Sequence, residues 1–144
     1  MGAWGLDSFE NDDALDWVQN ELEPLGEEAI DSAISAVLVE GYLDAPECSS
    51  AVAACEVLAV WQGRPSNGIP ADIRALAEGF SGRPSKELRE KARRALVSIV
   101  EDSELQGLIA EGDGPEYEQW KKAMAHACLI KIGRKIGKAL AWKK

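Results

Sequence analysis

The chain has 144 residues, of which 46% are hydrophobic and 28% are charged. These proportions are ordinary for one folded domain with its own core, so they exclude a largely disordered chain. Alanine and leucine are plentiful and threonine is absent, which favours helices over sheets, and we expect an all-α fold.

Hydrophobic periodicity and capping residues predict a compact single-domain bundle of six or seven helices, spanning residues 1–144. The helices are expected over 12–23, 27–40, 46–63, 70–78, 85–102, a short segment from 103, and 116–141. The 46–63 helix is apolar nearly all round, so we expect it at the centre of the bundle. The order in which the helices pack is not predicted.

The first of these helices begins with a crowded acidic turn. Asp12, Asp13 and Asp16 lie where carboxylates favourably oppose the positive end of the helix dipole. Its buried stripe is expected to contain Ala14, Leu15, Val18 and Leu22. Pro24 and Gly26 are expected to end it.

Charge is distributed very unevenly along the chain. Residues 1–63 contain 14 carboxylates and no Lys or Arg, whereas residues 119–144 contain 8 basic residues and no carboxylate. We expect the final helix, with its basic extension over 131–144, to pack on the bundle and face the acidic half. This helix has three other interpretations: it could bind nucleic acid, an acidic membrane surface or a partner protein. An overall pI near 4.7 argues against nucleic acid as the main partner.

The opening residues indicate where the chain resides. Met1-Gly2-Ala3-Trp4-Gly5 has neither the basic nor the apolar region of a secretory signal. No apolar run approaches the roughly 18 residues that a membrane span needs. We therefore expect a cytoplasmic protein without a membrane span.

Reactive side chains are few. The three cysteines, Cys48, Cys55 and Cys128, lack C-x-x-C spacing, and we interpret them as small core hydrophobes rather than zinc ligands or a disulfide framework. His126 is the single histidine, and a separation of two residues on a helix points it away from Cys128. No nucleotide-binding glycine motif occurs. We expect no catalytic residue, no metal and no cofactor.

The candidate partner-binding residues are Trp4, Asp12, Asp13, Asp16 and Trp17. With Glu10, the aspartates form the densest carboxylate cluster, which could bind Mg²⁺ or Ca²⁺ or supply an acid/base pair, although helix capping explains them more simply. Trp17, like Trp61 and Trp120, falls on an expected core stripe. Trp4 lies in a glycine-flanked arm that either fills a groove of its own domain, which we prefer, or meets a partner.

Several segments resemble one family. The opening M-G-A-W-G, followed by F-E-N-D-D-A and the pair Asp16-Trp17, resembles the start of the bacterial domain-of-unknown-function family 4259. The resemblance continues through Y-L-D-A-P-E at 42–47, A-A-C-E at 53–56, Ile69-Pro70 and D-S-E-L at 102–105, to about residue 130. Similar proteins tend to have Leu-Trp shortly afterwards, where Leu108-Ile109 stands here. The resemblance implies a small cytoplasmic bacterial protein and brings no assigned activity.

Three functions remain open from the sequence. The first is a non-enzymatic protein-binding module whose acidic first 63 residues steer a basic partner, for example an immunity protein that neutralises a basic toxin. The second is a small metal-assisted hydrolase that uses Asp12, Asp13 and Asp16. The third is a self-associating scaffold, in which the acidic half of one chain meets the basic tail of another.

Overall fold

The computed structural model describes residues 12–39, 43–63 and 69–101, and every regular element in these ranges is a helix. The elements are α1 (Asp12–Trp17), the π-helix η1 (Val18–Leu22), α2 (Glu23–Leu25), α3 (Glu27–Ala36), α4 (Ala45–Trp61), α5 (Ala71–Glu78) and α6 (Lys86–Glu101). The expected all-α fold is thus confirmed. The helices predicted from 103 and over 116–141, and the basic extension, lie outside the described residues. In the described part, no helix has the length and apolarity to cross a membrane.

The first helical run, α1–η1–α2, continues from Asp12 to Leu25 and passes through Pro24. Our prediction that Pro24 ends the run is therefore wrong. Proline lacks an N–H and crowds the carbonyl four residues earlier, which a regular α-helix tolerates poorly. Here the backbone widens immediately before the proline, and the Glu23 N–H donates to the carbonyl of Val18 in the π-pattern. Gly26, with φ of 64°, does end the run, as expected.

The buried face of this run differs in one residue from the expected stripe. Ala14, Val18 and Leu22 are buried, but Leu15 is 37% exposed. Successive residues of an α-helix are about 100° apart, so Leu15 lies on the side of Ala14 that faces away from Trp17. The large indole of Trp17 takes the inner position instead and is only 6% exposed.

The helix α3 is shorter than the predicted 27–40 helix. It buries Ile30 and Ile34 and ends at Ala36. Beyond it the backbone tightens, because the N–H of Val37 donates to Ile34 O at 3.3 Å and that of Leu38 to Ser35 O at 3.0 Å. Val37 still points into the core and is 2% exposed.

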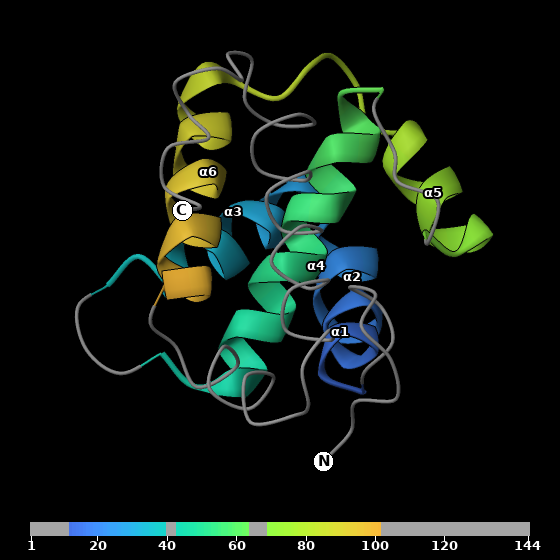
Figure 1. Ribbon diagram of the computed structural model, residues 1–144. Coiled ribbons are helices and arrows are strands. Elements are labelled where there is room, and N and C mark those ends of the chain that lie inside the picture. The colour runs from blue at the N-terminus through green and yellow to red at the C-terminus, as the bar shows by residue number, and fades with distance from the viewer. Residues whose placement is uncertain (1–11, 40–42, 64–68, 102–144) are drawn as a thin grey trace.

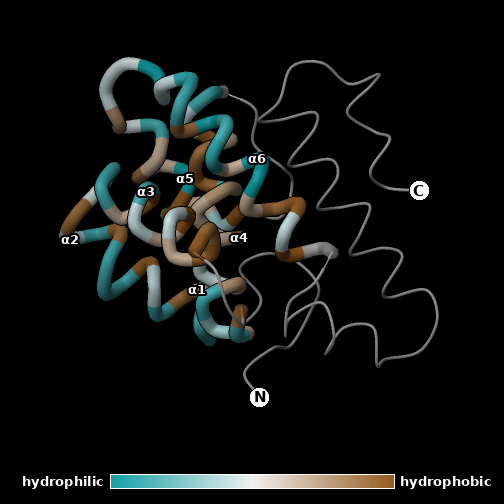
Figure 2. Tube along the Cα trace, turned by 90° about the vertical axis from the view of Figure 1, so that its left-hand side faces the viewer, coloured by the Kyte–Doolittle hydropathy of each residue, from teal (hydrophilic) through white to brown (hydrophobic). Residues whose placement is uncertain are grey.

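The helix α4 lies at the centre of the described helices and contacts α1, α3, α5 and α6 (Figure 1). It begins at a good cap, since Asp44 Oδ1 accepts a hydrogen bond from the Glu47 N–H at 3.0 Å. Every residue from Ala51 to Val60 is buried, and Figure 2 shows hydrophobic residues gathered around this helix. The expected central position is confirmed.

Side-chain contacts order the chain around the last two helices. After α4, Trp61 packs edge-to-face on Phe80 with ring centroids 5.4 Å apart, and its Nε1–H donates to Gly82 O at 3.1 Å. Ser85 caps α6 by accepting from the Leu88 N–H at 3.0 Å. The inner face of α6 consists of Ala92, Ala95, Leu96 and Ile99, which are all buried.

Candidate functional site

A pocket of about 420 Å³ opens between the first helical run, α3 and the start of α4. Eleven residues line it: Asp13, Asp16, Trp17, Asn20, Glu21, Ser32, Ala33, Ala36, Pro46, Glu47 and Ser50. Its volume is within the roughly 300–1,000 Å³ range of ligand-sized pockets. Four of the lining residues are acidic, and none is basic.

The first helical run supplies one wall. Asp13, Asp16 and Trp17 are three and four residues apart on α1, a spacing that places side chains on one helical face. The widened η1 turn then carries Asn20 and Glu21 to the same pocket. Single π-turns inside helices recur at functional sites, because they redirect the side chains that follow.

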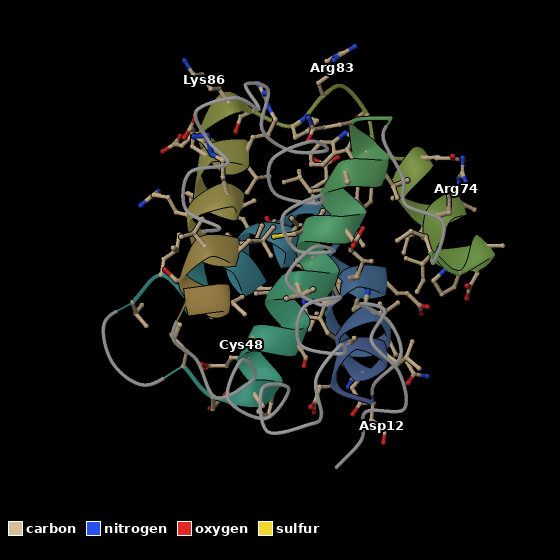
Figure 3. The ribbon with its side chains drawn as sticks, in the orientation of Figure 1. Asp12, Cys48, Arg74, Arg83 and Lys86 are labelled. Carbon is tan, nitrogen blue, oxygen red and sulfur yellow. The ribbon has the colours of Figure 1, made fainter. Side chains whose placement is uncertain are left out.

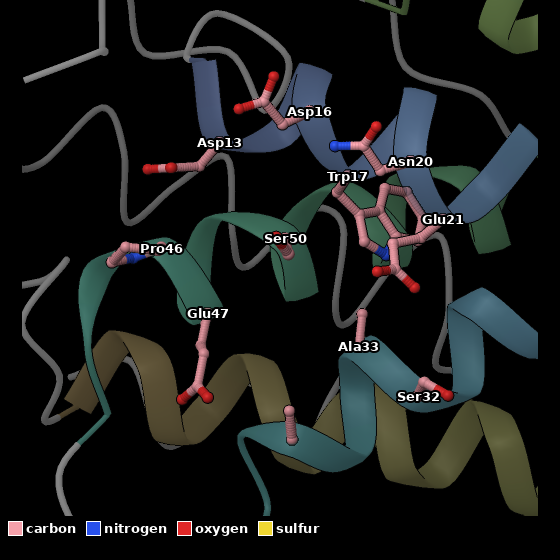
Figure 4. A pocket seen from close by; sticks show the side chains of 11 residues that line it. Asp13, Asp16, Trp17, Asn20, Glu21, Ser32, Ala33, Pro46, Glu47 and Ser50 are labelled. Atoms are coloured by element: carbon pink, nitrogen blue, oxygen red, sulfur yellow. The ribbon is translucent and has the colours of Figure 1, made fainter.

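The other walls come from α3 and α4. The α3 side contributes the small residues Ser32, Ala33 and Ala36, which leave the space open. The first turns of α4 contribute Glu47 and Ser50. In Figure 4, Asp13 and Asp16 lie along one rim and Glu47 lies on the opposite side of the opening. The carboxylates thus approach the pocket from two separate helical segments.

Trp17 forms part of the floor. Its side chain is more than nine-tenths buried, yet it lines the pocket. In Figure 4 the indole reaches from α1 toward Ala33 of α3.

The surface around the pocket is strongly acidic. Over 12–39 and 43–63 the sequence has eleven carboxylates and no Lys or Arg, and eight of these carboxylates are exposed. One of the eight, Asp31 on α3, forms an ion pair with Lys91 of α6 at 2.5 Å. The hydrogen bond from Lys91 holds the pKa of Asp31 below its ordinary value. The pocket itself has no such cation among its lining residues.

The helices that follow α4 contain charges of both signs. Residues 69–101 contain seven basic and five acidic residues. Figure 3 shows Arg83 and Lys86 at the end of the molecule opposite to Asp12. Two of the cations in this region are neutralised along their own helices, Arg74 by Glu78 and Arg93 by Glu90.

The structure brings together three of the five residues singled out from the sequence. Asp13, Asp16 and Trp17 line the pocket, whereas Asp12 is exposed on the same helix without lining it. Trp4 lies outside the described residues. Sequence reasoning missed Glu21, Glu47 and the hydroxyl and amide groups around them. Their contribution depends on how α3 and α4 pack against the first run, which the sequence did not predict.

The described ranges contain no metal site, and their two cysteines are buried. Across residues 12–39, 43–63 and 69–101, no three His, Cys, Asp or Glu side chains are placed so that they could hold a metal ion. Cys48 and Cys55 are buried in the core, as expected, and Cys55 Sγ lies 3.8 Å from Ala92 O. Cys128 and His126 lie beyond these ranges.

Comparison with known proteins gives one match. A family model with the description "Domain of unknown function (DUF4259)" matches residues 2–123, which is more than half of the chain. The match includes every pocket residue. No curated protein and no solved structure matches the chain.

Proposed function

We propose that this chain, which belongs to the DUF4259 family of domains of unknown function, is a non-enzymatic module that binds a basic protein partner. One observation carries the proposal. Over residues 12–39 and 43–63 the surface has eight exposed carboxylates and no Lys or Arg, and one of the eight, Asp31, is paired with Lys91 of α6. Such a surface raises the local concentration of cationic partners and repels anionic ones.

The charge acts chiefly on the rate of association. Complementary charges steer diffusional encounter and can raise association rates by orders of magnitude at low salt. The effect declines as salt shortens the Debye length, which is about 8 Å at physiological ionic strength. A partner of this surface is therefore expected to associate rapidly at low salt and more slowly as salt is added.

The pocket gives the same surface a concave feature. Specific interfaces concentrate their binding energy in a few desolvated positions, and a pocket with a buried aromatic floor offers such a position. The combination of steering charge and a single recess suits recognition of a protein better than catalysis by the described residues.

The proposal is tested with the full chain immobilised and exposed to host lysate at low salt. We expect retention of a basic protein that elutes as the salt concentration rises and that rebinds after purification. Its association rate should fall severalfold in Glu27→Gln/Glu28→Gln, two exposed acidic positions of α3. Asp72→Asn/Glu87→Gln removes the same charge from α5 and α6 and should leave the rate nearly unchanged. If no protein is retained at low salt, the proposal is wrong.

A specific form of the proposal is an immunity-type protein that neutralises a basic toxin. Its acidity and the steering charge of α1–α4 support this form. The test is whether the purified chain protects against the retained partner. A toxic activity of that partner should be lost in the complex and should return when salt dissociates it.

Self-association is a second candidate, favoured by the position of Arg83 and Lys86 at the end of the described helices opposite to Asp12 (Figure 3). A head-to-tail contact between unlike surfaces is heterologous and builds rings or filaments. Sizing at low salt should then show oligomers that dissociate as salt is added. A monomer at low salt would contradict this candidate. Metal-assisted hydrolysis has no comparable support within the described residues.

A further inference from the structure

One face of α4 contains a buried carboxylate. With about 100° between successive helix residues, Glu56 shares a face of α4 with four other side chains. The members of this Glu56 face are Ser49, Val52, Ala53, Glu56 and Val60, and none of them is more than 7% exposed. In the described part of the chain, the buried polar residues are Ser49 and Glu56, and both belong to this face. The Glu56 face therefore holds apolar and polar groups together away from solvent.

The contacts of α4 with the other described helices lie on its remaining faces. Cys55, about 100° from Glu56, has its Sγ 3.8 Å from Ala92 O of α6. Ser50, about 120° from Glu56 in the other direction, lines the pocket with residues of α1 and α3. Figure 1 shows α1 and α3 behind α4, with α5 and α6 to either side, and the turned view of Figure 2 agrees. The described helices therefore do not cover the Glu56 face.

A cover for this face has to meet two requirements. The side chains of Val52, Ala53 and Val60 call for an apolar surface, because their exposure to water costs free energy. A buried carboxylate such as that of Glu56 is stable when a hydrogen-bond donor or a cation lies beside it. Residues 1–63 contain no Lys or Arg. A cation for Glu56 therefore has to come from a later part of the sequence.

The end of the chain meets both requirements. Residues 119–144 contain eight basic residues and no carboxylate, and their sequence predicts an apolar helical stripe through Cys128, Ile132 and Ile136. A helix over 116–141 is expected to be about 39 Å long, against roughly 26 Å for α4, so it is long enough to cover the Glu56 face. Figure 1 shows α6 running in the opposite direction to α4, so the chain leaves the described helices near the end at which α4 begins.

We propose that the Glu56 face of α4 is the docking surface for the chain's own 119–144 segment, whose apolar stripe packs on Val52 and Val60 and whose basic residues place a cation beside Glu56. The occupant is the same chain, because the five residues of the face are buried within one molecule. The inference does not rest on the proposed function. It places the basic segment on a different face of α4 from the one that lines the acidic pocket.

The test is nuclear magnetic resonance of the full chain with ¹³C-labelled Ile, Leu and Val methyl groups. We expect nuclear Overhauser effects from the methyls of Val52 or Val60 to those of Ile132 or Ile136, because packed methyl groups lie about 4–5 Å apart. Ile132→Val and Ile136→Val assign the signals of the segment while keeping its apolar stripe. Val57, which is buried on another face of α4, is the control and should show no effect to the segment.

The same spectra distinguish the other occupants of the face. Effects from Val52 and Val60 only to Leu105, Leu108 or Ile109 would place the preceding segment there and overturn the proposal. A mixture of labelled and unlabelled chains separates contacts within a chain from contacts between chains. If the effects to Ile132 or Ile136 passed only between chains, the occupant would be a second copy, and the proposal would again be wrong. The absence of any effect from the two valines to residues beyond 118 would overturn it as well.

The charged contact is tested by paired substitutions. Each basic residue of 119–144 is replaced by glutamine in turn, both in the native chain and in Glu56→Gln. For the residue beside Glu56, the change should lower the folding equilibrium constant at least about tenfold in the native chain, because a buried carboxylate loses its cation. In Glu56→Gln the same change should lower it less than about threefold. Urea unfolding measures both constants.

Arg64→Gln is the matched control, because Arg64 follows α4 directly and removes the same charge. Its effect should be equal in the native chain and in Glu56→Gln. If none of the eight substitutions in 119–144 depends on Glu56, or if only Arg64→Gln does, the segment does not supply the cation and the proposal is wrong. Should Glu56→Gln fail to fold, the methyl contacts of the native chain decide the matter alone.

Discussion

The helices on either side of α4 share one core but differ in how their charges are balanced. The α1–α3 side has exposed carboxylates and no basic residue, so its negative charge has no counterion within its own helices. The α5–α6 side mixes both signs, and Glu78 and Glu90 neutralise cations three or four residues away. One ion pair, Asp31 with Lys91, links the two sides.

The difference in charge balance distinguishes charges that help to stabilise the fold from charges that remain available to a partner. Local pairs such as Arg74 with Glu78 contribute only a few tenths of a kcal/mol, roughly 0.3–0.5 for i,i+4 helix pairs. Such pairs leave little net electrostatic potential at the protein surface. The carboxylates on the other side have no basic residue within α1–α3 to neutralise them, so they repel one another and their field extends into solvent. The acidic side is therefore the one on which we propose that a basic partner binds.

The largest expected effect on stability tests whether the two sides of α4 differ only in surface charge and share one core. Ile34 on the acidic side and Leu96 on the mixed side are both essentially inaccessible to solvent. Ile34→Ala and Leu96→Ala should each lower the free energy of unfolding by about 2–5 kcal/mol, because each leaves a cavity in the shared core. Urea unfolding measures this loss, and Leu25→Ala at a half-exposed position is the control. A loss below about 1 kcal/mol for one of the pair would indicate two separate cores.

Removing the helix caps is expected to have an intermediate effect on stability. Asp44 caps α4 and Ser85 caps α6, each through a hydrogen bond of 3.0 Å to a backbone N–H. Asp44→Ala and Ser85→Ala should each cost about 1 kcal/mol, since an N-cap acceptor satisfies a donor that the helix cannot. Thermal unfolding should show similar falls in Tm. If Asp44→Ala stabilised the protein instead, repulsion among the carboxylates would exceed the value of the cap.

Salt should act on the two sides differently. Screening weakens the repulsion among the α1–α3 carboxylates, so raising NaCl from about 20 to about 300 mM should increase Tm by roughly 2–4 °C. Glu27→Gln/Glu28→Gln should reduce this increase, and Asp72→Asn/Glu87→Gln should not. A fall in Tm with salt would mean that attraction between the two sides outweighs repulsion within the acidic one.

The smallest expected effect concerns the ion pair between Asp31 and Lys91, which links the two sides of α4. The pKa of Asp31 is lowered in the fold, so between the folded and unfolded values the unfolded chain binds more protons. The stabilisation is fully present above the ordinary pKa of about 3.9 and is lost as pH falls through the lowered value. Because Asp31 is 56% exposed, solvent reduces its contribution to a few tenths of a kcal/mol. Asp31→Asn should remove this part of the acid dependence of stability, whereas Asp72→Asn should leave it intact.

The sequence predicted the helices better than their irregularities. Periodicity and end signals located α4 to within two residues at each end, because its apolar run lies between Pro46 and Gly63. The π-turn of η1 was not predicted, since nothing in Val18–Leu22 departs from ordinary helical composition. Proline usually ends a helix, but the run continues through Pro24 because the backbone widens immediately before it.

The candidate site was predicted in part, for a similar reason. Asp13, Asp16 and Trp17 lie close together in sequence, so local spacing was enough to group them. Glu47 is distant along the chain and reaches the pocket only because α4 packs beside α1 and α3. Such long-range placement requires the order of helix packing, which hydrophobic patterns do not encode.

The burial of α4 on all sides has a consequence for motion. A helix that has no solvent-facing stripe cannot fray outward or tilt without separating its neighbours, so its amide protons should exchange with deuterium only when the whole assembly opens. The amides of η1, which border the pocket, should exchange sooner. Slow exchange in α4 would therefore report global opening, and a ligand that fills the pocket should retard exchange first in the widened turn.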